Sequence, residues 1–160
     1  MTDKHISLDA GNEAPAFTLP GDGGTEISLS DYAVKKFILY FYPRDDTSGC
    51  TKQAIGFTEL SGDFEKADAV VVGVSADSVQ SHDKFKAKHN LSIPLASDEQ
   101  NGMLKDYGVW VEKSMYGRKF MGIERTTFLI DRDGTIAQVW RKVKVPGHME
   151  AVLEAAQDLA

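Results

Sequence analysis

The segment Lys36–Tyr42 (KFILYFY) limits the folds that are open to this chain. After its first residue it is a continuous run of aliphatic and aromatic side chains, which is typical of a strand buried on both faces. A second run of this kind covers Ala69–Ser75, and between the two the apolar residues from Cys50 to Phe64 recur at helical spacing. Strand, helix and strand in this order predict a βαβ unit whose two strands are parallel.

The flanking segments extend this unit into a complete domain. Two short runs around Gly21–Gly24 predict an N-terminal hairpin, and Arg132-Asp133-Gly134 predicts the turn of a second hairpin. The elements expected after Ser75 are a helix opened by a cap at 77–78 and ending at 89, a strand at 94–96, a short helix capped by 97–99 and running to about 107, a long connection at 108–124, strands at 126–131 and 135–140, and a helix at 147–159. A βαβ half followed by a ββα half predicts an α/β protein with a thioredoxin-like fold.

Composition excludes several classes of protein. The 160 residues, 42% hydrophobic and 26% charged, suit one soluble domain over residues 1–160 and argue against a disordered chain. A net charge of −6 disfavours nucleic acid and anionic lipid as partners. The apolar runs are too short to span a bilayer, and no secretion signal is recognisable, so we expect a cytoplasmic protein.

The chain has a single cysteine, Cys50, which excludes an intrachain disulfide and a cysteine-rich metal site. Cys50 falls in the first turn of the helix predicted after the Lys36–Tyr42 strand. Unpaired N–H groups and the helix dipole favour a thiolate at that position. Gly49 keeps the backbone open beside the sulfur, and Thr47 offers a hydroxyl that could cap the helix or donate to the sulfur. The alternative is a buried filler cysteine, but the polar neighbours favour a reactive thiol at the mouth of a site rather than on the apolar stripe of the helix.

Pro43-x-x-x-Thr47-x-x-Cys50 resembles the active-site signature of the peroxiredoxins, thiol peroxidases built on a thioredoxin fold. The stretches at 12–24, 40–57 and 107–131 are similar to the Q-type, or bacterioferritin comigratory protein, branch. The resemblance implies that Cys50 attacks peroxide, that Thr47 holds the peroxide, and that Pro43 shields the sulfur. It also implies that Arg125 binds thiolate and peroxide together, which suits a permanently charged guanidinium. Because strand side chains alternate, either Tyr40 or Phe41 should face the site, and we favour Tyr40.

The resemblance implies hydrogen peroxide and organic hydroperoxides as substrates and no cofactor or metal. Many Q-type relatives carry a resolving cysteine five residues after the peroxidatic one, whereas this chain has Ile55 there, and Ser48 replaces a common proline. The sulfenic acid formed on Cys50 would then be reduced by an external thiol, either glutathione, thioredoxin or glutaredoxin. A peroxide sensor or a binding module with weak turnover is the alternative. We expect a monomer, because no coiled-coil seam is present.

Other polar residues are assigned no role. The four histidines, His5, His82, His89 and His148, lack metal-ligand spacing and are interpreted as solvated or capping residues. Asp45 and Asp46 are interpreted as loop carboxylates that suit the helix dipole.

Overall fold

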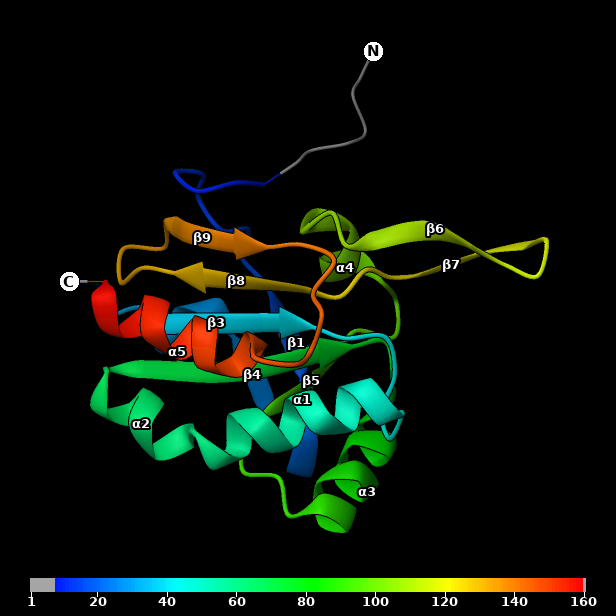
Figure 1. The fold of residues 1–160 in the computed structure, drawn as a ribbon, viewed down its shortest axis with the longest axis horizontal. Coiled ribbons are helices and arrows are strands. Elements are labelled where there is room, and N and C mark those ends of the chain that lie inside the picture. The colour runs from blue at the N-terminus through cyan, green and yellow to red at the C-terminus, as the bar shows by residue number, and fades with distance from the viewer. Residues whose placement is uncertain (1–7, 160) are drawn as a thin grey trace.

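The structure is a computed structural model, and it describes residues 8–159. Its core is a five-stranded sheet in the order β5-β4-β3-β8-β9 (Figure 1). The strands are β1 (Thr18–Pro20), β2 (Glu26–Ser28), β3 (Lys36–Phe41), β4 (Ala69–Ser75), β5 (Leu95–Ser97), β6 (Trp110–Met115), β7 (Arg118–Ile123), β8 (Thr126–Ile130) and β9 (Ile136–Trp140). The helices are α1 (Ser48–Glu59), α2 (Ser61–Lys66), α3 (Val79–His89), α4 (Gly102–Asp106) and α5 (His148–Asp158), with 3-10 turns at Asp22–Gly24 and Leu29–Tyr32.

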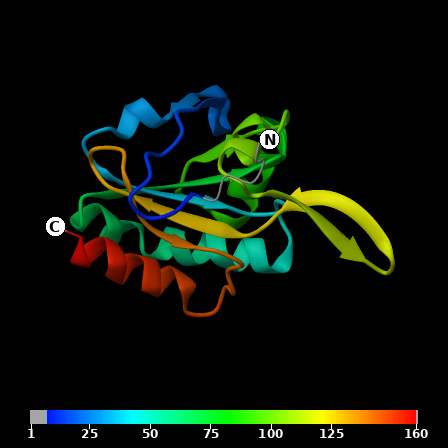
Figure 2. The same cartoon turned by 90° about the horizontal axis from the view of Figure 1, so that it is seen from above.

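Strand β3 is the centre of the molecule, and its six residues are all buried. Phe37, Leu39 and Phe41 point into one apolar cluster. Ile38 and Tyr40 point into a second cluster on the opposite face, because successive side chains of a strand alternate. Figure 2 shows α1, α2 and α5 on one face of the sheet and the N-terminal segment on the other. A thioredoxin-like α/β fold, as predicted, is therefore confirmed.

The predicted βαβ unit is confirmed. Strand β3 pairs in parallel with β4, and β4 pairs in parallel with β5. The prediction of a single helix from Cys50 to Phe64 is wrong in one respect. The helix is interrupted at Leu60, where φ is −93° and ψ is 3°. Ser61 and Gly62 are weak helix formers, and the break lets α2 bury Phe64 against the sheet.

Both predicted hairpins are present. Strand β1 pairs with β2 across the glycine-rich turn, and β8 pairs with β9 across Arg132-Asp133-Gly134. Gly134 has a φ of 86°, which is the left-handed conformation expected for the glycine of an Asp-Gly hairpin turn.

The long connection predicted at 108–124 is wrong. This segment is a third hairpin, β6–β7, which projects away from the sheet (Figure 1). Tyr116 and Gly117 both have positive φ, 53° and 76°, which is the type I′ turn geometry. Tyr-Gly is a weaker turn signal than Asn-Gly or Asp-Gly. Most of the flanking side chains are exposed, so no buried alternation marked the strands.

Helix α4 begins later than the 97–99 cap predicted. The N–H of Asp98 donates to the carbonyl of Ser75 (2.9 Å), which extends the sheet edge and keeps this residue out of the helix. Its carboxylate still accepts the N–H of Leu104 at 2.8 Å. The aspartate therefore satisfies a helical donor from a position four residues before Gly102, where the helix starts.

Within residues 8–159, no helix has both the length and the apolar character needed to cross a membrane.

The crowding of β3 against β4 gives a test of the packing. A Cβ added at Gly73 would lie 2.7 Å from Cζ of Tyr40 and 3.0 Å from Cδ2 of Leu95. Because the Tyr40 ring is rigid and buried, we expect Gly73→Ala to lower the free energy of unfolding by about 1–3 kcal/mol. Urea unfolding measures this difference.

The control is Gly62→Ala at an exposed position of helix α2, where a Cβ meets no described atom within 4 Å. This change should raise the free energy of unfolding by up to about 1 kcal/mol, because alanine favours helix more than glycine. Equal effects of the two substitutions would contradict the packing described here.

Candidate active site

The site is assembled by the pairing of two strands. Helix α1 follows the carboxyl end of β3, with Cys50 as its third residue. In the antiparallel pair of β3 and β8, Phe41 lies opposite Thr126. The start of β8 therefore lies beside the end of β3, and Arg125, the residue before β8, reaches the first turn of α1.

Arg125 joins two residues of α1. Its Nη2 donates to Sγ of Cys50 at 3.3 Å, and its Nη1 donates to Oε1 of Gln53 at 2.6 Å. Gln53 was missed by the sequence reasoning, although it lies three residues after Cys50 and so on the same helix face. Its side chain is fully buried, and its Nε2 has no hydrogen-bond partner among the described residues. Gln53 therefore fixes the guanidinium in the orientation that meets the sulfur.

Gly49 leaves the space that Arg125 fills. A Cβ at this position would come 3.1 Å from Nη2 of Arg125 and 3.9 Å from Cγ2 of Val145. A side chain here would press on the guanidinium that contacts Cys50.

Thr47 precedes the helix as its N-cap residue, but among the described residues its side chain makes no capping bond. Its hydroxyl instead donates to the carbonyl of Arg44 at 2.9 Å. Thr47 is exposed and Pro43 is half-buried, on the loop between β3 and α1. The structure therefore puts the Thr47 hydroxyl on a backbone carbonyl rather than on the sulfur.

Tyr40 lies on the Cys50 side of the sheet, and Phe41 lies on the other side. The Tyr40 ring packs on Phe57 with centroids 4.7 Å apart, and its hydroxyl has no partner among residues 8–159. Burial, followed by the nearby Cys50 and Asp45, raises the pKa of Tyr40 well above its usual value. Tyr40 therefore stays protonated beneath the site.

Cys50 is only 1% exposed and belongs to the same apolar cluster as Ala54 and Phe57. The expectation of a sulfur at the open mouth of a site, off the apolar stripe, is wrong in this structure. The first turn of α1 rotates Cys50 toward Arg125 and the sheet, so the sulfur combines an apolar surround with one cationic donor.

The interpretation of the histidines as solvated or capping residues is wrong for two of them, while His5 lies outside the described residues. His82 is fully buried, and His148 is 7% exposed. His148 Nε2 lies 2.9 Å from Oγ1 of Thr127, and the ring packs edge-on against Phe57 and Trp140. Burial, reinforced by the Arg125 charge, lowers the pKa of His148 to about 4. His148 is therefore neutral beside Arg125 at neutral pH.

Asp45 lies on the loop before α1, as interpreted from the sequence, but it is buried. It is 8% exposed and accepts hydrogen bonds from Tyr42 and Ser81. Asp46, on the same loop, is exposed and pairs with Lys88 and His89. Within residues 8–159, no group of three or more His, Cys, Asp or Glu side chains is placed to hold a metal ion.

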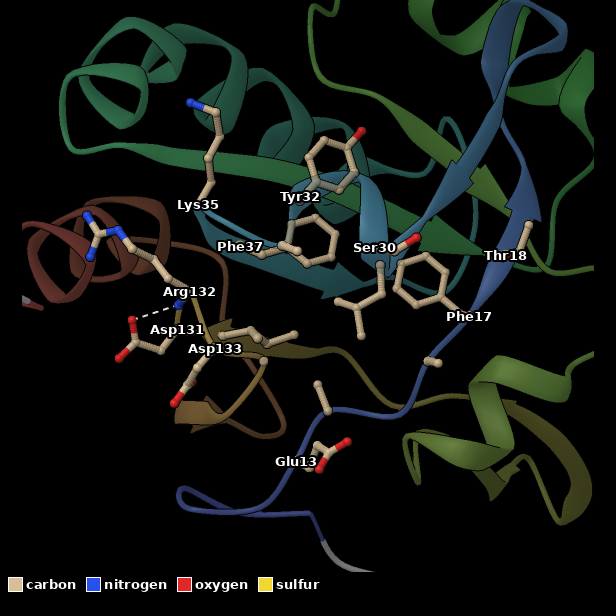
Figure 3. Close-up of a pocket in the computed structure, with 16 residues that line it drawn as sticks. Glu13, Phe17, Thr18, Ser30, Tyr32, Lys35, Phe37, Asp131, Arg132 and Asp133 are labelled. Carbon is tan, nitrogen blue, oxygen red and sulfur yellow. Dashed lines mark hydrogen bonds between the residues drawn. The ribbon is translucent and has the colours of Figure 1, made fainter.

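A cavity of about 550 Å³ lies near the start of β3, whereas Cys50 follows the end of that strand. Figure 3 shows the residues that line the cavity. Its walls include Phe17, Tyr32 and Phe37, and the Tyr32 and Phe37 rings stack with centroids 4.9 Å apart. Its rim carries both Lys35 and Asp133. None of the site candidates lines this cavity, so it is separate from the site around Cys50.

Comparison with known proteins gives one consistent result. The family model of the AhpC/TSA family matches residues 10–139. The putative peroxiredoxin bcp of Coxiella burnetii is 53% identical over 148 residues, 92% of this chain and 98% of the relative. A structure of Xanthomonas campestris peroxiredoxin Q has a TM-score of 0.89 at 44% identity, covering 96% of this chain and all of that one.

A structure of the Xanthomonas campestris bacterioferritin comigratory protein, from work on its alkyl peroxide reduction activity, has a TM-score of 0.87. It is 44% identical to this chain and covers 93% of it and 98% of the other chain. Structures of the Xanthomonas peroxiredoxin Q include cysteine-to-serine variants at two different positions, so that relative has at least two cysteines.

Similarity of this degree extends over almost the whole chain, and the molecule is accordingly a thiol-dependent peroxidase on a thioredoxin-like fold. The chain belongs to the AhpC/TSA family of peroxiredoxins, in the Bcp or Q-type branch.

The buried His148 predicts an acid sensitivity. Its pKa of about 4 lies below the unfolded value of about 6.5, so the unfolded chain binds a proton more readily. His148 therefore lowers the free energy of unfolding as the pH falls from about 6.5 to about 4. Urea unfolding across this range should show a shallower decline for His148→Gln than for the wild type. Identical pH dependence in the two proteins would contradict this account.

Proposed function

We propose that Cys50 is the peroxidatic residue of this enzyme. The Cys50 thiolate attacks the terminal oxygen of a hydroperoxide, so that an S–O bond forms and the O–O bond breaks. The departing oxygen takes up a proton and leaves as water or an alcohol, and Cys50 becomes a sulfenic acid. The observation that carries this proposal is the hydrogen bond of 3.3 Å from Arg125 to Sγ, because a fixed cation favours the thiolate.

Arg125 is proposed to act on both reactants. Its guanidinium, held by Gln53, has further N–H groups available for the two peroxide oxygens as negative charge moves to the leaving one. Gly49 is proposed to keep this approach open, which its 3.1 Å distance to Arg125 supports.

Thr47, Pro43 and Tyr40 are proposed to shape the peroxide site. The half-buried Pro43 is proposed to limit access of water to the sulfur. Thr47 is proposed to hold the peroxide, a role that requires its hydroxyl to turn from the Arg44 carbonyl. Tyr40 is fully buried, so its proposed contribution is to the wall beneath the sulfur rather than to direct contact with substrate.

The catalytic cycle is proposed to use one cysteine of this chain. Since Cys50 has no second cysteine and Ile55 stands where many relatives have one, an external thiol must attack the sulfenic acid. That attack releases water and leaves a mixed disulfide, which a second thiol reduces. Glutathione, thioredoxin and glutaredoxin are the candidate reductants.

Substrate, location and assembly are proposed from the remaining observations. The activity described for the Xanthomonas relative supports alkyl hydroperoxides as substrates beside hydrogen peroxide. An unpaired catalytic thiol supports a reducing compartment, the cytoplasm. A monomer is supported by the small set of exposed large apolar side chains among residues 8–159. These are Val34 and, on the narrow β6–β7 hairpin, Met115, Tyr116, Phe120 and Met121.

Removing the cation tests the central role of Arg125. Arg125→Met should slow the second-order reaction with hydrogen peroxide by roughly 100-fold to 1,000-fold, in the range found for other charge-stabilising groups. Stopped-flow or competition kinetics measures the rate. Arg118→Met on the exposed β7 strand removes the same charge away from the site and should react as the wild type does. Turnover that persists in Cys50→Ser would overturn the mechanism.

The fate of the sulfur tests the one-cysteine cycle. After one equivalent of peroxide, intact mass should show one added oxygen on Cys50, and a thiol adduct once reductant is present. Glutathione, thioredoxin and glutaredoxin, supplied in turn with their recycling enzymes, then identify the donor. Oxidation of Cys50 that none of the three reverses would favour a peroxide sensor instead.

A further inference from the structure

Two neighbouring aspartates attach the loop before α1 to helix α3. Asp46 lies on the surface, where it meets Lys88 at 2.7 Å and His89 at 2.9 Å near the end of α3. Asp45 turns inward and meets His82 in the first turn of α3 at 2.8 Å. The positive φ of Asp46, 60°, allows the two side chains to diverge.

The Asp45 carboxylate is fully used. Oδ1 accepts from the Tyr42 hydroxyl at 2.6 Å, and Oδ2 accepts from the Ser81 hydroxyl at 2.7 Å as well as meeting His82 Nδ1. The backbone N–H of Asp45 donates to Oδ2 of Asp77 at 2.8 Å. A carboxylate satisfied in this way is a strong anchor, because its bonds to Tyr42 and His82 are buried and the bond to Ser81 is partly buried.

The hydrogen-bond pattern places the protons. His82 Nε2 faces the carbonyl of Ala96 at 2.9 Å, which can only accept, so Nε2 carries a hydrogen. Nδ1 lies 2.8 Å from Oδ2 of Asp45, so these two atoms share a proton, and the raised pKa of His82 favours the cationic ring. Burial by itself lowers the pKa of His82, but the bond and charge of Asp45, with the Ala96 carbonyl, outweigh it and raise the pKa above its ordinary value.

The Asp45–His82 pair lies next to the reactive residues along the chain. Asp45 stands between Pro43 and Thr47. The Thr47 hydroxyl donates to the carbonyl of Arg44, and the Thr47 carbonyl accepts the N–H of Thr51 in the first turn of α1. A displacement of Asp45 is therefore passed to Thr47 and to the turn that carries Cys50.

We propose that Asp45 and His82 are positioning residues, a buried ion pair that holds the loop at 43–47 on α3 so that Thr47 and Cys50 meet peroxide in the reactive arrangement. This inference rests on the proposed role of Cys50 and adds a second support to the site. Arg125, next to the start of β8, contacts the sulfur of Cys50. The Asp45–His82 pair attaches the loop before α1 to helix α3.

The charge of the pair gives the positioning a pH dependence. The charged groups facing His82 are Asp45 from the loop after β3 and Asp77 from the connection before α3, and Tyr42 adds a neutral hydroxyl. Burial raises the pKa of Tyr42 well above its usual value, so Tyr42 remains a donor. Because the His82 pKa is raised, the ion pair is complete below the unfolded pKa of about 6.5 and is lost as the pH rises through the higher folded value.

Substitutions at the buried and the exposed anchor test the proposal. Asp45→Asn keeps the shape but presents an amide to three donors, and His82→Gln removes the cation. Each should slow the reaction of Cys50 with hydrogen peroxide on the order of 10-fold to 100-fold, the scale of a small misplacement of reacting groups. The double variant should be no slower than the slower single variant, because both remove one interaction. Asp46→Asn, at the exposed anchor, should react nearly as the wild type does, since surface ion pairs contribute little.

A pH profile separates positioning from a general loss of stability. The peroxide rate is divided by the thiolate fraction, obtained from the ultraviolet absorbance of the thiolate, at each pH. This rate per thiolate should fall in the wild type as the pH rises through the His82 pKa, and it should be flat in Asp45→Asn and His82→Gln. A flat wild-type profile, or variants as fast as the wild type, would overturn the proposal.

The same assay keeps the two proposals distinct. Cys50→Ser measures whether Cys50 reacts at all, so residual peroxidase activity in that variant refutes the proposed function. With Cys50→Ser inactive, the Asp45 and His82 variants test the positioning alone.

Discussion

The antiparallel pairing of β3 with β8 is the constraint on which the site depends. Cys50 comes from the segment after β3 and Arg125 from the segment before β8, and only this register brings the two together. A slip by one residue would turn Tyr40 and Leu39 to the wrong faces of the sheet and remove both apolar clusters. The packing of the core and the position of the guanidinium are therefore fixed by the same strand pair, so a protein that has folded has also placed its cation.

The charged group that contacts Cys50, Arg125, meets the sulfur in a largely buried setting. Arg125 is held by Gln53, and the neighbouring His148 is kept neutral by burial, so His148 adds no positive charge beside the sulfur. The effective dielectric constant is low in such a setting, and each hydrogen bond acts more strongly than it would at the surface. Asp45 and His82 apply the same physical principle to the loop, where a fully satisfied buried pair specifies one arrangement.

The sequence reveals those parts of the molecule whose causes are local. The buried strands Lys36–Phe41 and Ala69–Ser75, and the Asp-Gly turn at Gly134, follow from patterns within a few residues. The β6–β7 hairpin escaped prediction because its strands are exposed and its turn is Tyr-Gly.

Contacts between distant segments could not be read from the sequence for a different reason. Asp45 and His82 are 37 residues apart, and Gln53 and Arg125 are 72 apart, so no spacing rule links them. The resemblance to a known family identified Arg125 as a site residue. Its partner Gln53, and the contact of Asp45 with His82, became visible only in the folded structure.

The burial of Cys50 has a consequence for which molecules the enzyme meets. A cysteine's encounters with oxidants follow its exposure as well as its thiolate character. With 1% of the residue exposed, the sulfur is shielded from bulky electrophiles and from disulfides on other proteins. A small linear hydroperoxide needs far less room than either. The packing around Cys50 thus hinders large oxidants, and for the same reason the first turn of α1 would have to open before a protein thiol could reach the proposed sulfenic acid.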